Sequence, residues 1–251
     1  WDKLHILGGG RYDWVSAGRN ASLTSFSDAE NNVPKRRDSD FNPRVGVLYQ
    51  LLPQISLFGN WTTSFGANNG ISATGATFDP QRGEQFEAGI KTALYQERLL
   101  TTLAFYNLTR ENLLTPDLST PDLLDSIAIG KQRSKGIELD ISGQITEGLS
   151  VIGNYTYTDA EVIRDNSGLL GNRLPQAPKH AGSIWLRYDV KSIPQLNGLS
   201  FGVGVFAVGK RDGDIQNTFK LPGYARLDAF AAYRMKVGPT RLTAQVNARN
   251  I

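Results

Sequence analysis

Residues 128–160 constrain the fold of this chain more than any other segment. They contain two runs in which apolar and polar residues alternate, separated by a very short turn. Because successive side chains of a strand point to opposite faces, this pattern predicts a β-hairpin with one apolar and one polar surface. The apolar set is Ile137, Leu139, Ile141, Ile145, Leu149, Val151, Tyr155 and Tyr157, and the polar set is Glu138, Asp140, Ser142, Gln144, Ser150, Asn154, Thr156 and Thr158. Each run is long enough to cross a bilayer, which takes roughly 9–11 tilted residues, so the apolar surface meets either a protein core or lipid.

The amino-acid composition restricts the choice between a protein core and lipid as the partner of the apolar surface. No run of about 18 apolar residues is present in the sequence, so no transmembrane helix is expected. The mean hydropathy of −0.30 is modest, as in membrane barrels, whose strands expose only alternate residues to lipid. These 251 residues include no Cys, which removes disulfides and thiolate metal sites from consideration. The net charge of +3 is spread along the chain and gives no reason to expect a nucleic-acid partner.

The connections between strands carry the next inference. Alternation and turn residues predict about eleven strands, at 4–14, 42–51, 54–66, 83–95, 98–111, 128–145, 149–161, 180–190, 199–210, 223–236 and 241–251. Long connections (13–40, 66–82, 112–127, 162–179 and 211–222) alternate with shorter ones (52–53, 96–97, 146–148, 191–198 and 237–239). Outer-membrane barrels have short periplasmic turns and longer extracellular loops, whereas a soluble sandwich has no reason to keep its long loops at one end. The predicted fold is therefore all-β, an antiparallel up-and-down transmembrane β-barrel.

Charged residues then indicate which face is the lumen. An Arg on the lipid face near mid-membrane costs roughly 2–4 kcal/mol, so charged side chains within the strands should point into the lumen, where opposite charges can pair. These are Glu87, Lys91, Glu138, Asp140, Arg226 and Asp228. Two aromatic pairs, Tyr12 with Trp14 and Tyr155 with Tyr157, each share a face next to a long loop, as in the aromatic girdles of membrane interfaces.

Eight segments, in order, resemble a known family. They are LGGGRYDW (7–14), FNPRVGV (41–47), DPQRGEQFEAGIK (79–91), RSKGIELD (133–140), YTYTDA (155–160), GNRLPQAPKH (171–180), LPGYARLD (221–228) and VNARN (246–250). Together they resemble the barrel of TonB-dependent outer-membrane receptors, in the ferric-siderophore branch. The wording AIGKQRSKGIELD and YTYTDAEV is most similar to the ferric-hydroxamate (ferrichrome-like) subgroup.

This resemblance implies an incomplete barrel. Family barrels have 22 strands, so residues 1–251 correspond to the C-terminal half of the barrel, and the family's plug domain is not among them. Because an open sheet leaves unpaired edge groups that are costly in hydrocarbon, we expect this chain alone not to form a working receptor. The complete protein would be a monomer in the bacterial outer membrane that contacts lipid and lipopolysaccharide.

The resemblance also implies a transport mechanism without catalysis. A ferric siderophore would bind at the extracellular mouth, and TonB would act on the plug to release it inward. The iron arrives already chelated, so no cofactor or resident metal is expected, and the protein is not expected to be an enzyme. A passive outer-membrane pore, or another all-β binding module, is the alternative function.

Ligand contacts are expected in long loops or at upper strand ends, facing inward. Aromatic and Arg side chains suit a mostly apolar pocket that receives an anionic or neutral chelate. The candidates are Phe65, Phe78, Arg110, Arg173 and Arg211, and for each of them a girdle or loop-packing role is the alternative interpretation. The cluster Lys35-Arg36-Arg37 suits lipopolysaccharide phosphates or solvent better than the ligand. His5 and His180 are the two His that could act as catalytic bases, and both are better explained as structural strand residues.

Overall fold

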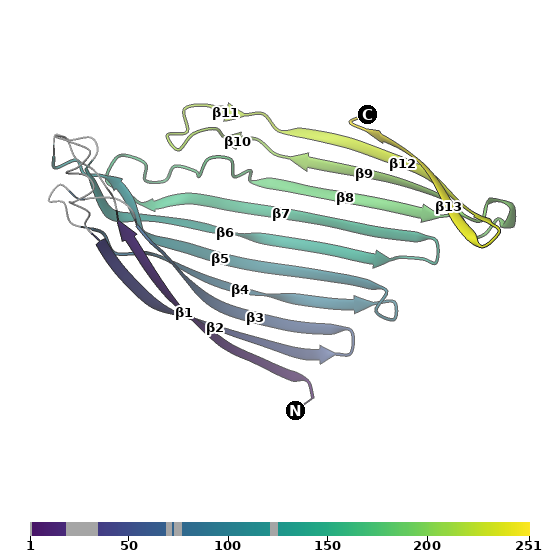
Figure 1. Cartoon of the computed structure of the whole chain (residues 1–251), viewed down its shortest axis with the longest axis horizontal. Coiled ribbons are helices and arrows are strands. Elements are labelled where there is room, and N and C mark those ends of the chain that lie inside the picture. The colour runs from purple at the N-terminus through teal and green to yellow at the C-terminus, as the bar shows by residue number, and fades with distance from the viewer. Residues whose placement is uncertain (1, 19–34, 69–71, 73–76, 121–124) are drawn as a thin grey trace.

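The structure, a computed structural model, is a single curved antiparallel sheet (Figure 1). It describes residues 2–18, 35–68, 72, 77–120 and 125–251, without the side chains at 17, 18, 35 and 36. The sheet has eleven strands in the order β1-β2-β3-β4-β5-β6-β7-β8-β9-β12-β13, so each strand pairs with its neighbour in sequence. Their bounds are β1 Leu4–Gly18, β2 Lys35–Leu52, β3 Ile55–Gly66, β4 Gln81–Leu94, β5 Leu99–Pro116, β6 Ser126–Gln144, β7 Leu149–Arg164, β8 His180–Asp189, β9 Leu199–Val208, β12 Tyr224–Val237 and β13 Thr240–Arg249. The prediction of an eleven-stranded antiparallel sheet is confirmed.

Register preserves the alternation seen in the sequence. In the β6–β7 pair, Leu139 lies opposite Tyr155 and Asp140 opposite Asn154. The rows continue across the sheet, because Leu139 also pairs with Leu103 of β5. Partners in an antiparallel pair share a face, so one face of the sheet collects the apolar residues and the other the polar ones. We call these the apolar face and the polar face.

The connections segregate by length, as predicted (Figure 1). The links β2–β3, β4–β5, β6–β7, β8–β9 and β12–β13 lie at one end of the sheet, and the longer connections lie at the other, which we call the loop end. The β12–β13 turn contains Gly238 at φ +58°, a left-handed conformation that glycine adopts without strain. The β8–β9 link includes a short 3-10 turn, η1, at Pro194–Leu196.

Two features at the loop end differ from the prediction. β1 and β2 stay paired as far as Gly18 and Lys35, well beyond the predicted strand ends at 14 and 42. The last connection contains a small hairpin of its own, β10 (Arg211–Asp212) with β11 (Lys220–Leu221), which was predicted to be loop. Neither segment carries the apolar–polar alternation from which the other strands were predicted.

The sheet has no second layer. Among the described residues no large side chain is fully buried, and the buried apolar set is Leu99, Ala104, Val151, Ala160, Val162, Val190 and Ala232. Large apolar residues stand exposed in mid-strand on the apolar face, including Ile90, Phe105 and Ile184. Within the described part of the chain, no helix is long and apolar enough to cross a membrane. The apolar face therefore needs an apolar environment that the chain itself does not supply.

Candidate functional site: the polar face and the loop end

Three carboxylates gather on the polar face in the middle of the sheet. Glu138 lies in one row with Ala104 and Gly89, and Glu87 and Asp140 lie in the rows next to it. None of the three carboxylates makes an ion pair with a described residue. We define these three residues, Glu87, Glu138 and Asp140, as the acidic patch. Because carboxylates seek charged hydrogen-bond donors, this patch suits a cationic partner.

Aromatic and cationic side chains share the polar face with this patch. The Lys91 ammonium lies 5.0 Å from the Phe58 ring centre, and Arg226 lies 5.8 Å from that of Phe206. Arg226 also forms an ion pair with Asp228, at 2.9 Å. The Arg226–Asp228 contact confirms the expectation that charged strand residues share one face and can pair there. A surface that combines aromatic rings with charged groups packs more favourably against a partner surface of mixed polarity than against open water.

Two long connections are locked together at the loop end. Arg173, in the β7–β8 connection, contacts Asp159 at 3.0 Å and Asp212 of β10 at 3.7 Å. The side chain of Asp212 is only 5% exposed, so loss of Arg173 would leave a nearly buried carboxylate without this ion-pair partner. Asn217 adds a reciprocal pair, because it accepts from the Arg173 backbone N–H (2.8 Å) and donates to the Arg173 carbonyl (2.9 Å). Arg211 donates to Gln176 at 3.2 Å and ties the two connections together again.

Two aspartates shape these same connections from within. Burial raises the pKa of Asp165. Hydrogen bonds from the Leu169 and Ser167 backbone N–H groups and the Ser167 hydroxyl outweigh this effect, so the pKa is lowered overall. The Thr218 hydroxyl and backbone N–H donate to Asp214 and lower its pKa. Both carboxylates are therefore held ionised as hydrogen-bond acceptors that fix the loop backbone.

A second group of residues lines cavities at the loop end of β2–β5. Two neighbouring cavities, of about 430 Å³ and 420 Å³, share Arg82 and Glu111 in their walls. Arg82 forms an ion pair with Asp40 at 3.1 Å, and Glu111 accepts from Lys131 at 3.1 Å. Phe65 lines the larger cavity. The arrangement places an exposed guanidinium, carboxylates and one ring together at the loop end of β2–β5, in the row of Phe65, Arg82 and Glu111.

The structure does not bring the five predicted ligand residues into one site. Phe65 lies with Arg82 at the β3–β4 end, Phe78 is half-buried in the same connection, and Arg110 of β5 donates to Gln81 at 2.7 Å. Arg173 and Arg211 lie in the locked connections several strands away. The inward orientation expected for Phe65 is wrong, because strand alternation places it on the face of Trp61, which pairs with Val45 and Phe86. Contact of any of the five with a ligand stays a prediction.

Sequence reasoning missed Arg82, Glu111 and Asp212. Arg82 and Glu111 lie directly opposite each other in the β4–β5 pair, so a correct register would have brought them together. Asp212 carried no such signal, because its contact with Arg173 depends on how two connections fold over the sheet. In the Lys35-Arg36-Arg37 cluster, Arg37 is exposed, and the side chains of Lys35 and Arg36 lie outside the described residues.

The eleven antiparallel strands are 10 to 19 residues long, and each pairs with the next strand of the sheet along the chain. The sheet is apolar on one face and has its long connections at one end. These features define the wall of an outer-membrane-type β-barrel. The family model described as "TonB dependent receptor-like, beta-barrel" matches residues 1–251, and the chain belongs to this family. The predicted family is confirmed.

Several known proteins are similar over the whole chain. The metal-pseudopaline receptor CntO of Pseudomonas aeruginosa is 37% identical over 251 residues, which are 100% of this chain and 35% of that protein. The ferrichrome outer membrane transporter/phage receptor of Escherichia coli K12 is 32% identical over 100% of this chain and 32% of its own length. The crystal structure of BauA, the ferric preacinetobactin receptor of Acinetobacter baumannii, superposes with a TM-score of 0.84 at 27% identity, covering 99% of this chain and 36% of that one. The chain thus spans about a third of the length of the relatives it matches.

Proposed function

We propose that this chain forms the C-terminal half of the barrel of a TonB-energised receptor that imports a ferric siderophore across the bacterial outer membrane. The match of the family model to residues 1–251 carries this proposal. The names of the relatives support it, since they include receptors for metal-pseudopaline, ferrichrome and ferrioxamine B. These relatives are receptors and transporters, not enzymes, and we propose no catalytic role or resident cofactor for this chain.

The polar face supports the presence of a plug. In this proposal the apolar face meets lipid, the polar face lines the lumen, and a plug domain fills it. The acidic patch of Glu87, Glu138 and Asp140 would then receive cationic plug side chains, which replace water as partners of the carboxylates. When TonB acts on the plug, these contacts would be among those broken or rearranged. The barrel would contribute the wall, the mouth and its loops.

We further propose a hydroxamate-type siderophore as cargo, on the sequences of residues 128–140 and 155–162 and the ferrichrome and ferrioxamine B receptors among the relatives. Selectivity would also depend on the plug and on the rest of the barrel.

The test is radioactive iron uptake in a strain that lacks its own siderophore receptors and expresses the full-length protein. We expect uptake from ferrichrome and ferrioxamine B, saturation at low concentration, and loss of uptake when tonB is deleted. Uptake from catecholates alone would refute the hydroxamate assignment. Uptake that persists without TonB and does not saturate would instead identify a passive pore.

A further inference from the structure

The end of the sheet opposite the loop end, which we call the turn end (Figure 1), carries a pocket of about 500 Å³ on the polar face. Its lining comes from β8, β9, β12, β13 and the link between β8 and β9. A row of small side chains forms the floor, because Ser200 lies opposite Ala232 and both are buried. The pocket therefore lies on the same face as the acidic patch but apart from it, since that patch belongs to β4 and β6.

Aromatic rings form the wall of the pocket toward the middle of the sheet. Phe230 lines the pocket, and its ring stacks on that of Trp185 with 5.8 Å between centres and 6° between planes. Both rings lie against β9, because a Cβ added at Gly202 would overlap Phe230 and one added at Gly204 would overlap Trp185. Such a wall can contact the apolar parts of an organic ligand.

The rim of the pocket at the turn end is cationic. Lys191 and Arg234 line it, and Lys236 and Arg241 lie opposite each other in the next row of the polar face. All four side chains belong to exposed residues, and none of them makes an ion pair within the part of the chain that the structure describes. We call these four residues, together with the pocket, the basic pocket.

The basic pocket lacks negative partners for these cations. Among the described residues that line it, Asp189 carries the one carboxylate, and Arg187 already donates to that carboxylate at 2.8 Å. Segments 190–199 and 233–243, which supply the four cations, contain no Asp or Glu. A ligand with negatively charged oxygens would provide the charge that this part of the wall lacks.

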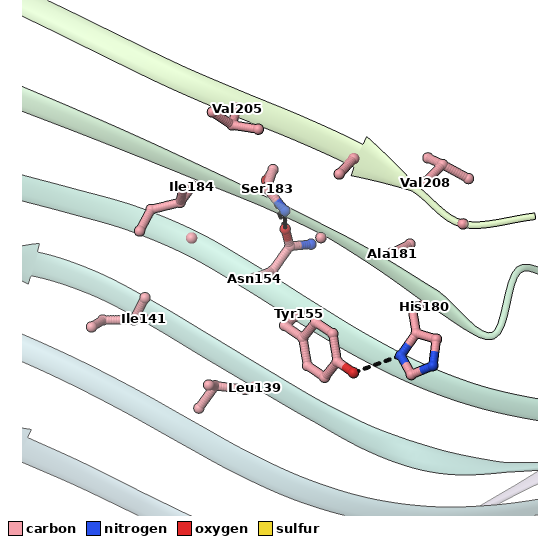
Figure 2. A pocket seen from close by; sticks show the side chains of 14 residues that line it. Leu139, Ile141, Asn154, Tyr155, His180, Ala181, Ser183, Ile184, Val205 and Val208 are labelled. Atoms are coloured by element: carbon pink, nitrogen blue, oxygen red, sulfur yellow. Dashed lines mark hydrogen bonds between the residues drawn. The ribbon is translucent and has the colours of Figure 1, made fainter. Parts of the chain in front are cut away.

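The apolar face of the neighbouring strands has a different character. A hollow of about 570 Å³ on that face is lined by apolar side chains such as Leu139, Ile141 and Ile184 (Figure 2). Two of its polar groups, the Tyr155 hydroxyl and Nδ1 of His180, lie 2.7 Å apart and are hydrogen-bonded to each other. A charged or strongly polar ligand would therefore bind at the basic pocket and not in this hollow.

We propose that the basic pocket is a second, transient site for the transported ferric chelate, which binds there through its negatively charged oxygens on the way to the periplasm. The inference rests on the proposed function, because it takes the polar face as the lumen and the turn end as the periplasmic end. A chelate that is released inward from the mouth has to pass the turn end. The hydroxamate oxygens that hold the iron carry negative charge, so Lys and Arg side chains can donate hydrogen bonds to them.

The size and composition of the basic pocket fit such a ligand. Small-molecule sites typically measure roughly 300–1,000 Å³ and combine apolar walls with a few polar groups. Here the Phe230 ring would contact the organic part of the chelate, and Lys191 and Arg234 would donate to its oxygens. Water competes for exposed cations, so the site binds weakly and can release the chelate again.

Photochemical crosslinking during transport tests the site. Cells expressing the full-length receptor would import ferrichrome or ferrioxamine B, whichever is taken up faster, as a derivative that carries a diazirine. We expect crosslinks to peptides from 187–200 and 230–245 when TonB is present, and none of these when tonB is deleted. Because Arg234→Gln removes one charge-assisted hydrogen bond, it should lower these crosslinks about tenfold relative to crosslinks at the mouth.

Two further variants separate the charge from structural effects. Arg234→Lys keeps the positive charge and should restore most of the crosslinking. Arg98→Gln removes an exposed arginine at the turn end, in the β4–β5 link and outside the basic pocket, and should leave crosslinking at the wild-type level. Heat-modifiable gel mobility would show that each variant is folded.

Uptake without crosslinks to these peptides, or equal crosslinking in Arg234→Gln and the wild type, would overturn this inference and leave the receptor assignment intact. A carbodiimide crosslink from Lys191 to a carboxylate elsewhere in the full-length protein, with no chelate crosslinks, would show instead that another part of the protein fills the pocket. Absence of uptake of both chelates would contradict the proposed function itself.

Discussion

Replacing Ile184 by arginine should destabilise the folded barrel in lipid, whereas the same replacement at Ile152 should be tolerated. The two isoleucines are mid-strand neighbours on β8 and β7, and their side chains are 47% and 60% exposed, respectively. Ile184 pairs with Gly153 on the apolar face, and Ile152 pairs with Trp185 on the polar face. Size, strand type and depth are therefore matched, and only the face differs.

The magnitude follows from the cost of a guanidinium in hydrocarbon. Arginine on the lipid face near the bilayer midplane costs roughly 2–4 kcal/mol. At about 1.4 kcal/mol per factor of ten, Ile184→Arg should lower the folding equilibrium constant in lipid by about a hundredfold. Ile152→Arg faces a polar lumen and should cost less than about 1 kcal/mol.

The assay is urea titration of the full-length receptor folded into phospholipid vesicles, with heat-modifiable gel mobility as the readout of the folded barrel. Outer-membrane levels in cells provide a second measurement. Equal destabilisation by the two variants would refute the assignment of faces. A larger cost at Ile152 would mean that the apolar face packs on protein and the polar face is not a lumen.

Three further predictions concern the loops and the lumen. Arg173→Ala should destabilise the locked connections by about 1–3 kcal/mol, because the nearly buried Asp212 loses its ion-pair partner. Proteolysis within 162–179 should therefore be faster than in the wild type, and Arg211→Ala serves as the milder control. Glu138→Gln should lower TonB-dependent iron uptake without lowering the amount of receptor in the membrane, because the acidic patch loses charge. Because the pKa of Asp214 is lowered in the folded loop, its contribution to stability is fully present above the ordinary aspartate pKa of 3.8 and is lost as pH falls through the folded-state pKa. Amide protection measured by hydrogen exchange at residues 214–218 should therefore be constant from about pH 5 to 8 and decrease below about pH 3.8.

The membrane-spanning part of the fold could be predicted from the sequence, because one physical rule, the alternation of side chains between two faces, governs it. In β7 and β8, alternate residues face different environments, so the sequence itself shows a period of two, and the predicted first residues, 149 and 180, match the structure. Above this zone the rule no longer applies. β1 extends to Gly18 and β2 begins at Lys35 without apolar–polar alternation, and β10–β11 is formed by residues that carry no strand pattern.

The candidate site was harder to predict from the sequence, because it depends on contacts between the loops that connect the strands. Arg173 has the residue type expected of a ligand contact, yet in the structure its guanidinium is held by Asp159 and Asp212. Nothing in the local sequence separates a loop-locking Arg from a ligand-binding one, since the same guanidinium can pair with a carboxylate of the protein or with an acceptor of a ligand. The position of Arg82 opposite Glu111 could have been predicted from the sequence, because it follows from the register of β4 and β5.

Closure of the wall decides whether these separate groups form one site. The cavity residue Phe65 ends β3, whereas Arg211 follows β9, and the two strands are six positions apart in the sheet. At about 4.8 Å per strand, a flat sheet would hold them roughly 29 Å apart. Curvature into a barrel shortens this distance, and completion of the wall by the rest of the protein would remove the unpaired edges of β1 and β13, which hydrocarbon does not tolerate. We therefore expect ligand selectivity to depend on the complete barrel and not on any one loop of this chain.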